Sequence, residues 1–172
     1  MDAGRGDAPR PLIMIHIDRG GDVKGTKAFF DRWQSYGVDY DVIGQSYYPW
    51  WHGSLLDLRE NLRFMAETYQ KDIIVVEAAY NWRPTEYKEG GAPFPETPEG
   101  QRDFLDEVNR AVLATPHHRG KGVFWWEPAV APSPIHSRGM FDNEGSALPV
   151  ITVFDKFAKG NRPSRTPSVG PV

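Results

Sequence analysis

The chain has 172 residues, of which 40% are hydrophobic and 25% charged, and this composition suits one domain with a buried core rather than a disordered chain. A formal net charge of −3 provides no basic surface for a phosphate backbone, so we expect no nucleic-acid partner. There is no cysteine, and no apolar run approaches the roughly 20 residues of a membrane span, which excludes thiolate chemistry and argues against a membrane partner.

In chain order, residues 1–10 are small and polar and predict a disordered lead-in. They lack the basic-then-apolar order of a signal peptide, so the localisation stays unknown. The apolar run at 11–18 ends at Asp18 and a glycine pair, which favours a buried strand. A helix is predicted at 25–36, where apolar residues recur at helical spacing: Ala28, Phe29, Trp33 and Tyr36.

The same alternation continues along the chain. Residues 40–46 predict a second strand, and an aromatic loop follows it. The next helix has one apolar face, formed by Leu55, Leu58, Leu62 and Met65. Residues 72–78 form a continuous β-branched run, which is typical of a strand covered on both faces. A long loop over 79–97 leads to a helix with apolar residues at helical spacing: Phe104, Leu105, Val108, Val112 and Leu113.

A fourth strand is predicted at 121–126, and a last helical segment at 148–158 precedes a Pro/Ser-rich tail at 160–172. Four strand–helix units over 11–159 predict an α/β domain with a parallel sheet. A (β/α)8 barrel needs about 250 residues, so the chain holds four units of such a fold. An open four-stranded sheet exposes an apolar face or two bare edges, and we expect something else to cover them.

Aromatic residues make up 13% of the chain, with six Trp and seven Tyr, and several of them cluster in loops. Aromatic faces stack on the C–H faces of sugar rings, but tryptophan is also a good core residue. Composition therefore leaves two readings open, sugar binding and plain packing.

Several loop segments are more specific. DVIGQSYYPWWHG (41–53), IIVVEAAYNW (73–82), TPEGQRDFL (97–105) and GVFWWEPA (122–129) resemble the last strands and loops of glycoside hydrolase family 53, the arabinogalactan endo-β-1,4-galactanases. The resemblance covers residues 11 to about 158. It implies half of a (β/α)8 TIM barrel, with the four units equivalent to strands five to eight, and a retaining hydrolase of β-1,4-galactan.

The resemblance places a catalytic nucleophile at Glu77, at the end of the seventh barrel strand. A carboxylate suits this role because it can form and release a glycosyl ester. The alternative is a strand-end glutamate in a structural ion pair. Further candidates follow the strands at the end where this fold has its active sites, and we expect them to bind substrate: His16, Asp18, Tyr47, Tyr48, Trp50, Trp51, Trp82 and Trp126.

Several of these candidates have equally plausible structural roles. His16 either bonds a sugar hydroxyl, orients Glu77 or is a satisfied structural group, and the tryptophans either stack on sugar or pack in the core. Asp18 and Asp22 are also candidate helix caps. Calcium occurs in some family members, but the Asp-rich spacing for it is not evident here, so we expect no metal and no cofactor.

The family's acid/base glutamate belongs to the half of the barrel that this chain does not contain. The pair Asn143–Glu144 follows the eighth strand in a loop, so the role is not transferred to it. We expect a homodimer in which two half-barrels complete each other. The resemblance gives Glu127 a role in sugar binding or in support of the site, and the alternative is a structural carboxylate paired with a nearby His or Arg. In the dimer, Glu127 of one chain would also face Glu77 of the other as acid/base, and hydrolysis would be weak. The alternative function is a non-catalytic carbohydrate-binding or residual half-barrel scaffold.

Overall fold

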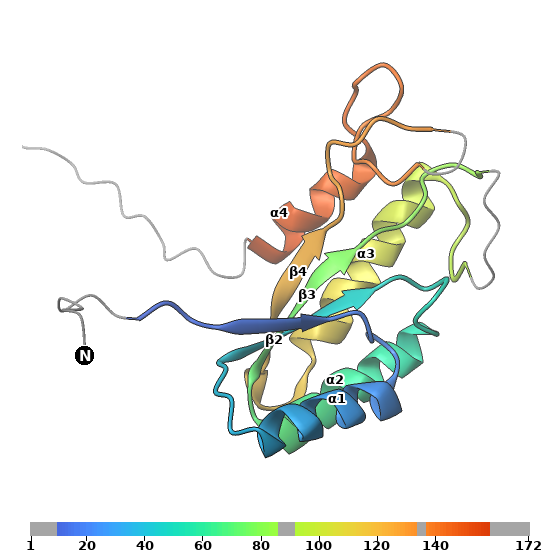
Figure 1. Cartoon of the computed structure of the whole chain (residues 1–172). Helices are drawn as coiled ribbons and strands as arrows, with labels where there is room; N and C mark the ends of the chain where they lie inside the picture. Colours follow the sequence, from blue (N-terminus) through green and yellow to red (C-terminus); the bar gives the residue numbers. More distant parts are fainter. Residues whose placement is uncertain (1–9, 86–91, 134–136, 159–172) are drawn as a thin grey trace, which may run out of the picture.

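Four parallel strands lie side by side in the order β1-β2-β3-β4 and alternate with helices, which confirms the α/β class (Figure 1). The computed structural model describes residues 10–85, 92–133 and 137–158. Its elements follow in chain order: β1 (Met14–Ile17), α1 (Val23–Ser35), β2 (Val42–Tyr47), α2 (Leu55–Tyr69), β3 (Asp72–Ala78), α3 (Pro98–Leu113), η1 (Pro116–His118), β4 (Gly120–Trp125), η2 (Pro149–Ile151) and α4 (Thr152–Ala158).

Side-chain caps fix where the three long helices begin. The carboxylate of Asp22 accepts a hydrogen bond from the Gly25 N–H at 2.8 Å, so Asp22 caps α1 and Asp18 does not. At α2, Ser54 and Asp57 form a reciprocal capping box. Thr97 caps α3 through the Gly100 N–H at 3.0 Å. Each cap satisfies N–H groups that have no partner within the helix.

The core lies between the sheet and the helices. Ile43, Ile73 and Val75 point toward the helices and are fully buried. Phe104 of α3 is at the centre of this layer, where it stacks on Tyr80 and packs edge-on against Trp125. The side chains between these positions point to the other face of the sheet, because successive residues of a strand alternate between its two faces.

That other face has no covering layer among the described residues. Phe124 of β4 is 60% exposed there, and Met14 of β1 is also exposed. In a closed barrel this face would be the filled interior. The two outer strands, β1 and β4, each pair on one side only within the described sheet. The sheet therefore has the open face and the two free edges that the sequence predicts for a half-barrel.

Two predicted elements differ in detail from the observed ones. The strand expected at 11–18 is reduced to Met14–Ile17, because Pro11 has no N–H to pair and β2 begins only at Val42. The helix expected at 25–36 buries Thr26 and Phe30 instead of the predicted stripe. Phe29, one of the residues of that stripe, stacks on Trp33 with ring centroids 5.7 Å apart, beside the unpaired edge of β1.

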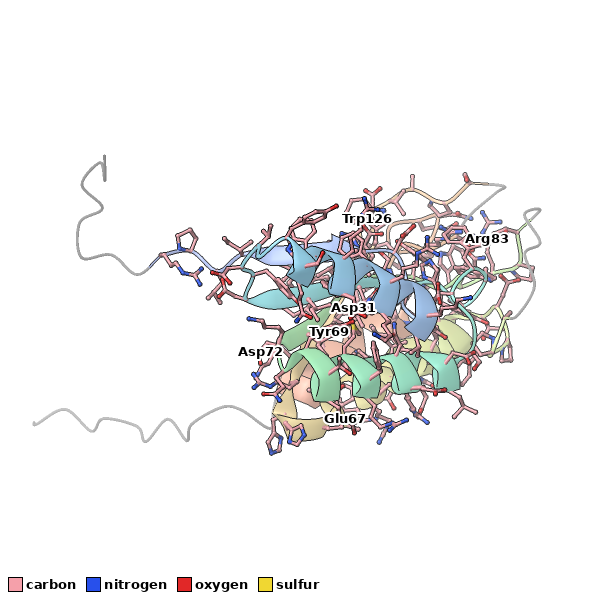
Figure 2. All side chains as sticks on the ribbon, turned by 60° about the horizontal axis from the view of Figure 1, so that its bottom comes forward. Asp31, Glu67, Tyr69, Asp72, Arg83 and Trp126 are labelled. Atoms are coloured by element: carbon pink, nitrogen blue, oxygen red, sulfur yellow. The ribbon has the colours of Figure 1, made fainter. Side chains whose placement is uncertain are left out.

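Polar contacts link neighbouring helices and join the starts of neighbouring strands. The Tyr69 hydroxyl donates to Asp31 at 3.0 Å and links α2 to α1 (Figure 2). At the start of β3, Asp72 pairs with Arg119 at 3.2 Å and Lys121 at 3.4 Å. These ion pairs lie at the opposite end of the strands from the candidate site.

The predicted lead-in and tail fall almost entirely outside the described residues. The exception is Arg10, which forms a two-pronged ion pair with Asp41 at 2.7 Å. This guanidinium, with the Ile13 N–H, lowers the pKa of Asp41 to about 2. Within the described part of the chain, no helix is both long and apolar enough to cross a bilayer.

Candidate functional site

All four strands run in the same direction, so their C-terminal ends meet at one edge of the sheet (Figure 1). Glu77 is near the end of β3 and is partly buried. The Tyr48 hydroxyl, just after β2, donates a hydrogen bond to Glu77 Oε2 at 2.9 Å. This contact joins two of the predicted site residues and gives the carboxylate a fixed orientation.

Tyr48 remains a neutral donor over the whole ordinary pH range. Burial of its ring raises the pKa of Tyr48 well above 10, and the hydrogen bond to Glu77 raises it further. A phenol that keeps its proton holds a carboxylate oxygen in place and competes with water for it.

His16 and Ser46 extend this site toward β1. His16 Nε2 and Ser46 Oγ are 2.7 Å apart, and Ser46 is the register partner of Glu77 on the neighbouring strand. His16 therefore hydrogen-bonds Ser46, whereas the donor to Glu77 is Tyr48. Ser46 was missed by the sequence analysis, because a single serine in an apolar strand carries no signal of its own.

The aromatic loop after β2 divides into an anchored and an exposed part. Trp50 stacks on Tyr80 with ring centroids 5.6 Å apart and planes at 12°. Trp51 packs against Tyr48 at 5.1 Å but is 48% exposed. Trp50 is therefore held by packing, whereas the exposed part of the Trp51 ring is available to stack on a ligand.

His52 holds the backbone of this loop and contacts the edge of the exposed Trp51 ring. Its Nδ1 accepts a hydrogen bond from the Tyr48 N–H at 3.1 Å, which requires the neutral imidazole. Burial lowers the pKa of His52 from its ordinary value of 6.5 and stabilises that neutral form. His52 was not among the predicted site residues.

The end of β4 contributes Trp126 and Glu127. The Trp126 N–H donates to the Ala78 carbonyl at 2.9 Å, and its ring is 52% exposed. Glu127 is exposed, and its charge contributes to the raised pKa of Tyr48. Glu127 therefore lies near the group that holds Glu77 within the same chain.

The structure corrects the expectation for Tyr47, which is 0% exposed. Its ring stacks on Phe104 at 6.0 Å, and its hydroxyl donates to the Gly53 carbonyl at 3.2 Å. Tyr47 is the last residue of β2 and points toward the helices, while Tyr48 continues toward the site. A ring enclosed in the core has no face left for a ligand.

Trp82 and Asp18 contact residues other than Glu77 and Tyr48 in the described structure. Trp82 is partly buried, with Arg83 over its ring at 5.3 Å and its backbone N–H bonded to Ser137. Asp18 is exposed and has a long ion pair with Arg19 at 3.9 Å.

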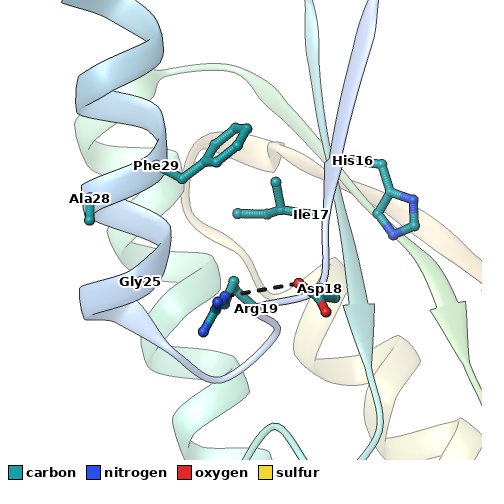
Figure 3. A pocket seen from close by; sticks show the side chains of 7 residues that line it. All are labelled: His16, Ile17, Asp18, Arg19, Gly25, Ala28 and Phe29. Carbon is teal, nitrogen blue, oxygen red and sulfur yellow. Dashed lines mark ion pairs between the residues drawn. The ribbon is translucent and has the colours of Figure 1, made fainter.

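A groove of about 530 Å³ runs along the free edge of β1, beside α1 (Figure 3). Ile17, Ala28 and Phe29 line it, so its floor is apolar. His16 leaves β1 on the opposite face from Ile17, toward Ser46 and the site.

Arg138, from the segment after β4, is a further residue that the sequence did not indicate. Its guanidinium carbon is 5.8 Å from the Tyr48 ring, 4.8 Å from Trp50 and 5.4 Å from Trp51. Only the fold brings these distant segments together.

A metal site finds no support in the described residues, where no three His, Asp or Glu side chains cluster to hold an ion. In the loop that contains Asn143 and Glu144, the Asp142 carboxylate accepts from the Glu144 and Ser146 N–H groups. It shapes this loop through backbone contacts.

Chemically, the arrangement offers a carboxylate that accepts a hydrogen bond from Tyr48, an adjacent serine–histidine pair and two half-exposed indole rings. A carboxylate of this kind can act as a nucleophile or a general base. The free rings suit a ligand with an apolar face, such as a sugar.

Comparison with known proteins connects this arrangement to one family. The sequence pattern of glycosyl hydrolase family 53 matches residues 1–154. An uncharacterized protein from the bgaB 5' region of Niallia circulans is 43% identical over 83% of this chain and 41% of the relative. A probable arabinogalactan endo-β-1,4-galactanase A of Aspergillus fumigatus is 38% identical over 71% of this chain and 37% of the relative.

Solved structures give the same relationship. A structure of fungal β-1,4-galactanases matches with a TM-score of 0.76 and 32% identity, over 87% of this chain and 49% of that one. The catalytic core of xylanase A, at 12% identity and a TM-score of 0.62, shares the fold alone. The chain thus spans about half the length of the relatives it matches, or somewhat less. Sequence and fold agree, and the chain belongs to glycosyl hydrolase family 53.

Proposed function

We propose that the protein is a glycoside hydrolase of β-1,4-galactan that works by retention, with Glu77 as the nucleophile. The observation that carries this proposal is the hydrogen bond from Tyr48 to Glu77, at the end of the sheet where this fold has its active sites. Membership of the family and the galactanase names of its relatives support the substrate class.

In the proposed reaction, a Glu77 carboxylate oxygen attacks the anomeric carbon and forms a glycosyl ester. A second carboxyl group gives its proton to the leaving glycosidic oxygen. That group, now a carboxylate, takes a proton from water as the water breaks the ester. Retention requires the two carboxyl groups to be about 5–5.5 Å apart.

For the second carboxyl group we propose Glu127 of a second copy, in a homodimer of two half-barrels. The free edges of β1 and β4 and the exposed inner face around Phe124 support this assembly. In a ring of eight strands, β4 of one copy lies next to β1 of the other. Glu127 then takes the place from which the family's acid/base projects. Glu127 belongs to the equivalent of the eighth strand and would replace a glutamate of the fourth strand. Because small errors in the placement of a catalytic group reduce the rate strongly, we expect slow hydrolysis.

The groove beside β1 supports the same assembly. A barrel helix lies over its own strand and the next one, so α4 of the second copy would lie against this groove. Phe154 of α4 is 40% exposed and would meet Ile17, Ala28 and Phe29 in this arrangement. Burial of such rings is the main source of association free energy.

The test of the nucleophile is release of reducing ends from β-1,4-galactan. We expect the parent to release them and Glu77→Gln to release none, since the amide keeps the shape but cannot form the ester. Glu60→Gln, an exposed residue of α2, is the matched control and should match the parent. Parent-level release by Glu77→Gln would refute the assignment.

The cross-chain site is tested by mixing two inactive variants, Glu77→Gln and Glu127→Gln. One composite site in each mixed dimer keeps both carboxyl groups, so we expect activity to return after subunit exchange. If the parent is active and the exchanged mixture is not, Glu127 does not act across the interface. A stable mass of 19.5 kDa in sedimentation would refute the dimer itself.

The second candidate function is a non-catalytic carbohydrate-binding scaffold. The half-exposed rings of Trp51 and Trp126 favour it, because stacking on sugar requires no second carboxylate. Binding of galactan without any release of reducing ends would support this alternative.

A further inference from the structure

The guanidinium of Arg138 lies against three aromatic rings of the loop after β2. Its guanidinium carbon is 4.8 Å from the centre of the Trp50 ring, 5.4 Å from Trp51 and 5.8 Å from Tyr48. The arginine side chain is partly buried, so water screens these contacts less than it would at a fully exposed site.

The backbone of this arginine is held independently of its side chain. The Arg138 carbonyl accepts a hydrogen bond from Trp125 Nε1 at 2.7 Å. Gln101 of α3 donates to the neighbouring Gly139 carbonyl at 3.0 Å. The starting point of the side chain is therefore fixed to β4 and α3, and the guanidinium reaches from there to the loop of β2.

The three rings differ in how firmly the rest of the fold holds them. Trp50 continues a column of stacked rings through Tyr80 to Phe104, at 5.6 and 4.7 Å. Tyr48 is buried and bonded to Glu77. Trp51 is half-exposed, and its ring contacts are with Tyr48, Trp50, His52 and Arg138.

We propose that Arg138 is a positioning residue that sets the angle of the exposed Trp51 ring against the fixed pair of Trp50 and Tyr48, and so aligns the sugar-stacking surface with Glu77. The planar guanidinium can lie against several rings at once, which a lysine ammonium cannot do equally well. A ring held in its binding orientation before the sugar arrives loses less freedom on binding. The inference rests on the proposed function in one respect, that the ligand of Trp51 is a β-linked galactose unit.

The test compares Arg138→Met, which keeps an apolar stem of similar bulk but removes the charged plane, with Arg138→Lys, which keeps the charge. The first readout is the circular-dichroism couplet that two neighbouring indoles produce, because Trp50 and Trp51 are 6.3 Å apart at 61°. The second is quenching of tryptophan fluorescence by β-1,4-galactotetraose, and the third is KM and kcat on galactan.

In Arg138→Met we expect a weakened couplet and roughly tenfold weaker tetraose binding, with KM raised by a similar factor and kcat changed less than about threefold. Arg138→Lys should recover part of the couplet and of the affinity. Arg32→Met is the matched control, since Arg32 covers Tyr36 at 6.0 Å on α1. It should leave all three readouts at the parent values.

An unchanged couplet with unchanged binding in Arg138→Met would overturn the inference. So would equal losses in Arg138→Met and the Arg32→Met control. If Arg138→Met does not fold, Arg138→Lys decides by its couplet and its affinity. If the parent binds no galactan, the proposed function fails, and the couplet still tests whether Arg138 sets the angle of the Trp51 ring.

Discussion

At the scale of single residues, the contact between Tyr48 and Glu77 has the most direct functional consequence. Tyr48→Phe removes the donated hydrogen bond but keeps the ring and its packing. A hydrogen bond to a charged group is worth about 1.5–3 kcal/mol. We therefore expect kcat/KM on galactan to fall by about tenfold to a hundredfold. Tyr36→Phe, at the exposed tyrosine that follows α1, is the control and should match the parent.

The same loop makes stability depend on pH through His52. The folded chain keeps this side chain neutral because burial lowers its pKa. The unfolded chain takes up the proton first as the pH falls below about 6.5. The free energy of unfolding then decreases until the pH reaches the lower pKa of the folded state, and this contribution is constant beyond it.

The measurement is the melting temperature at a series of pH values. His52→Asn keeps an acceptor for the Tyr48 N–H but does not titrate, so its curve should be flatter than that of the parent in this window. His118→Asn, at an exposed histidine of η1, should keep the slope of the parent. Asp41 does not interfere, since its pKa of about 2 places its loss at lower pH. Equal slopes in all three proteins would show that His52 is not the titrating group.

At the scale of elements, the helix caps decide where the βα units begin. Ser54→Ala removes the two hydrogen bonds of the Ser54 hydroxyl, which accepts from the Asp57 N–H and donates to the Asp57 carboxylate. The Ser54 backbone N–H keeps its bond to the same carboxylate. We expect the free energy of unfolding in urea to fall by about 1 kcal/mol. Ser35→Ala, at the C-terminal end of α1, is the matched control, with a change within about 0.5 kcal/mol. A loss at position 35 as large as that at position 54 would contradict a specific role of the cap.

At the scale of the whole molecule, the open face of the sheet is the dominant feature. A half-barrel leaves Phe124 60% exposed, and a second half would bury it. A charge at this position is costly once it is enclosed but costs little in water. If the proposed dimer forms through this face, Phe124→Asp should reduce it to a particle of 19.5 kDa. Light scattering over a dilution series measures this mass.

Leu56→Asp is the matched control, because Leu56 is also largely exposed to water, at 71%, but lies on the outer surface of α2. It should leave the mass of the assembly unchanged. If Phe124→Asp and the parent have the same mass at every concentration, the inner face is not the interface.

The sequence by itself determined the order of the elements, the parallel sheet and the position of Glu77 at a strand end. These follow from local patterns, such as the β-branched run of β3 and the spacing of Leu58, Leu62 and Met65 in α2, because periodicity reports which face of an element is buried. The caps at Ser54 and Thr97 are local in the same way.

Only the tertiary structure decided which aromatic residues face the site. Tyr47 and Tyr48 are neighbours in the chain, yet one ring is enclosed under α3 and the other bonds Glu77, because successive side chains at a strand end point to opposite faces. Arg138 and Ser46 reach the site through long-range contacts that leave no local pattern in the sequence. The partners of a side chain far along the chain depend on packing, and packing exists only once the elements have assembled.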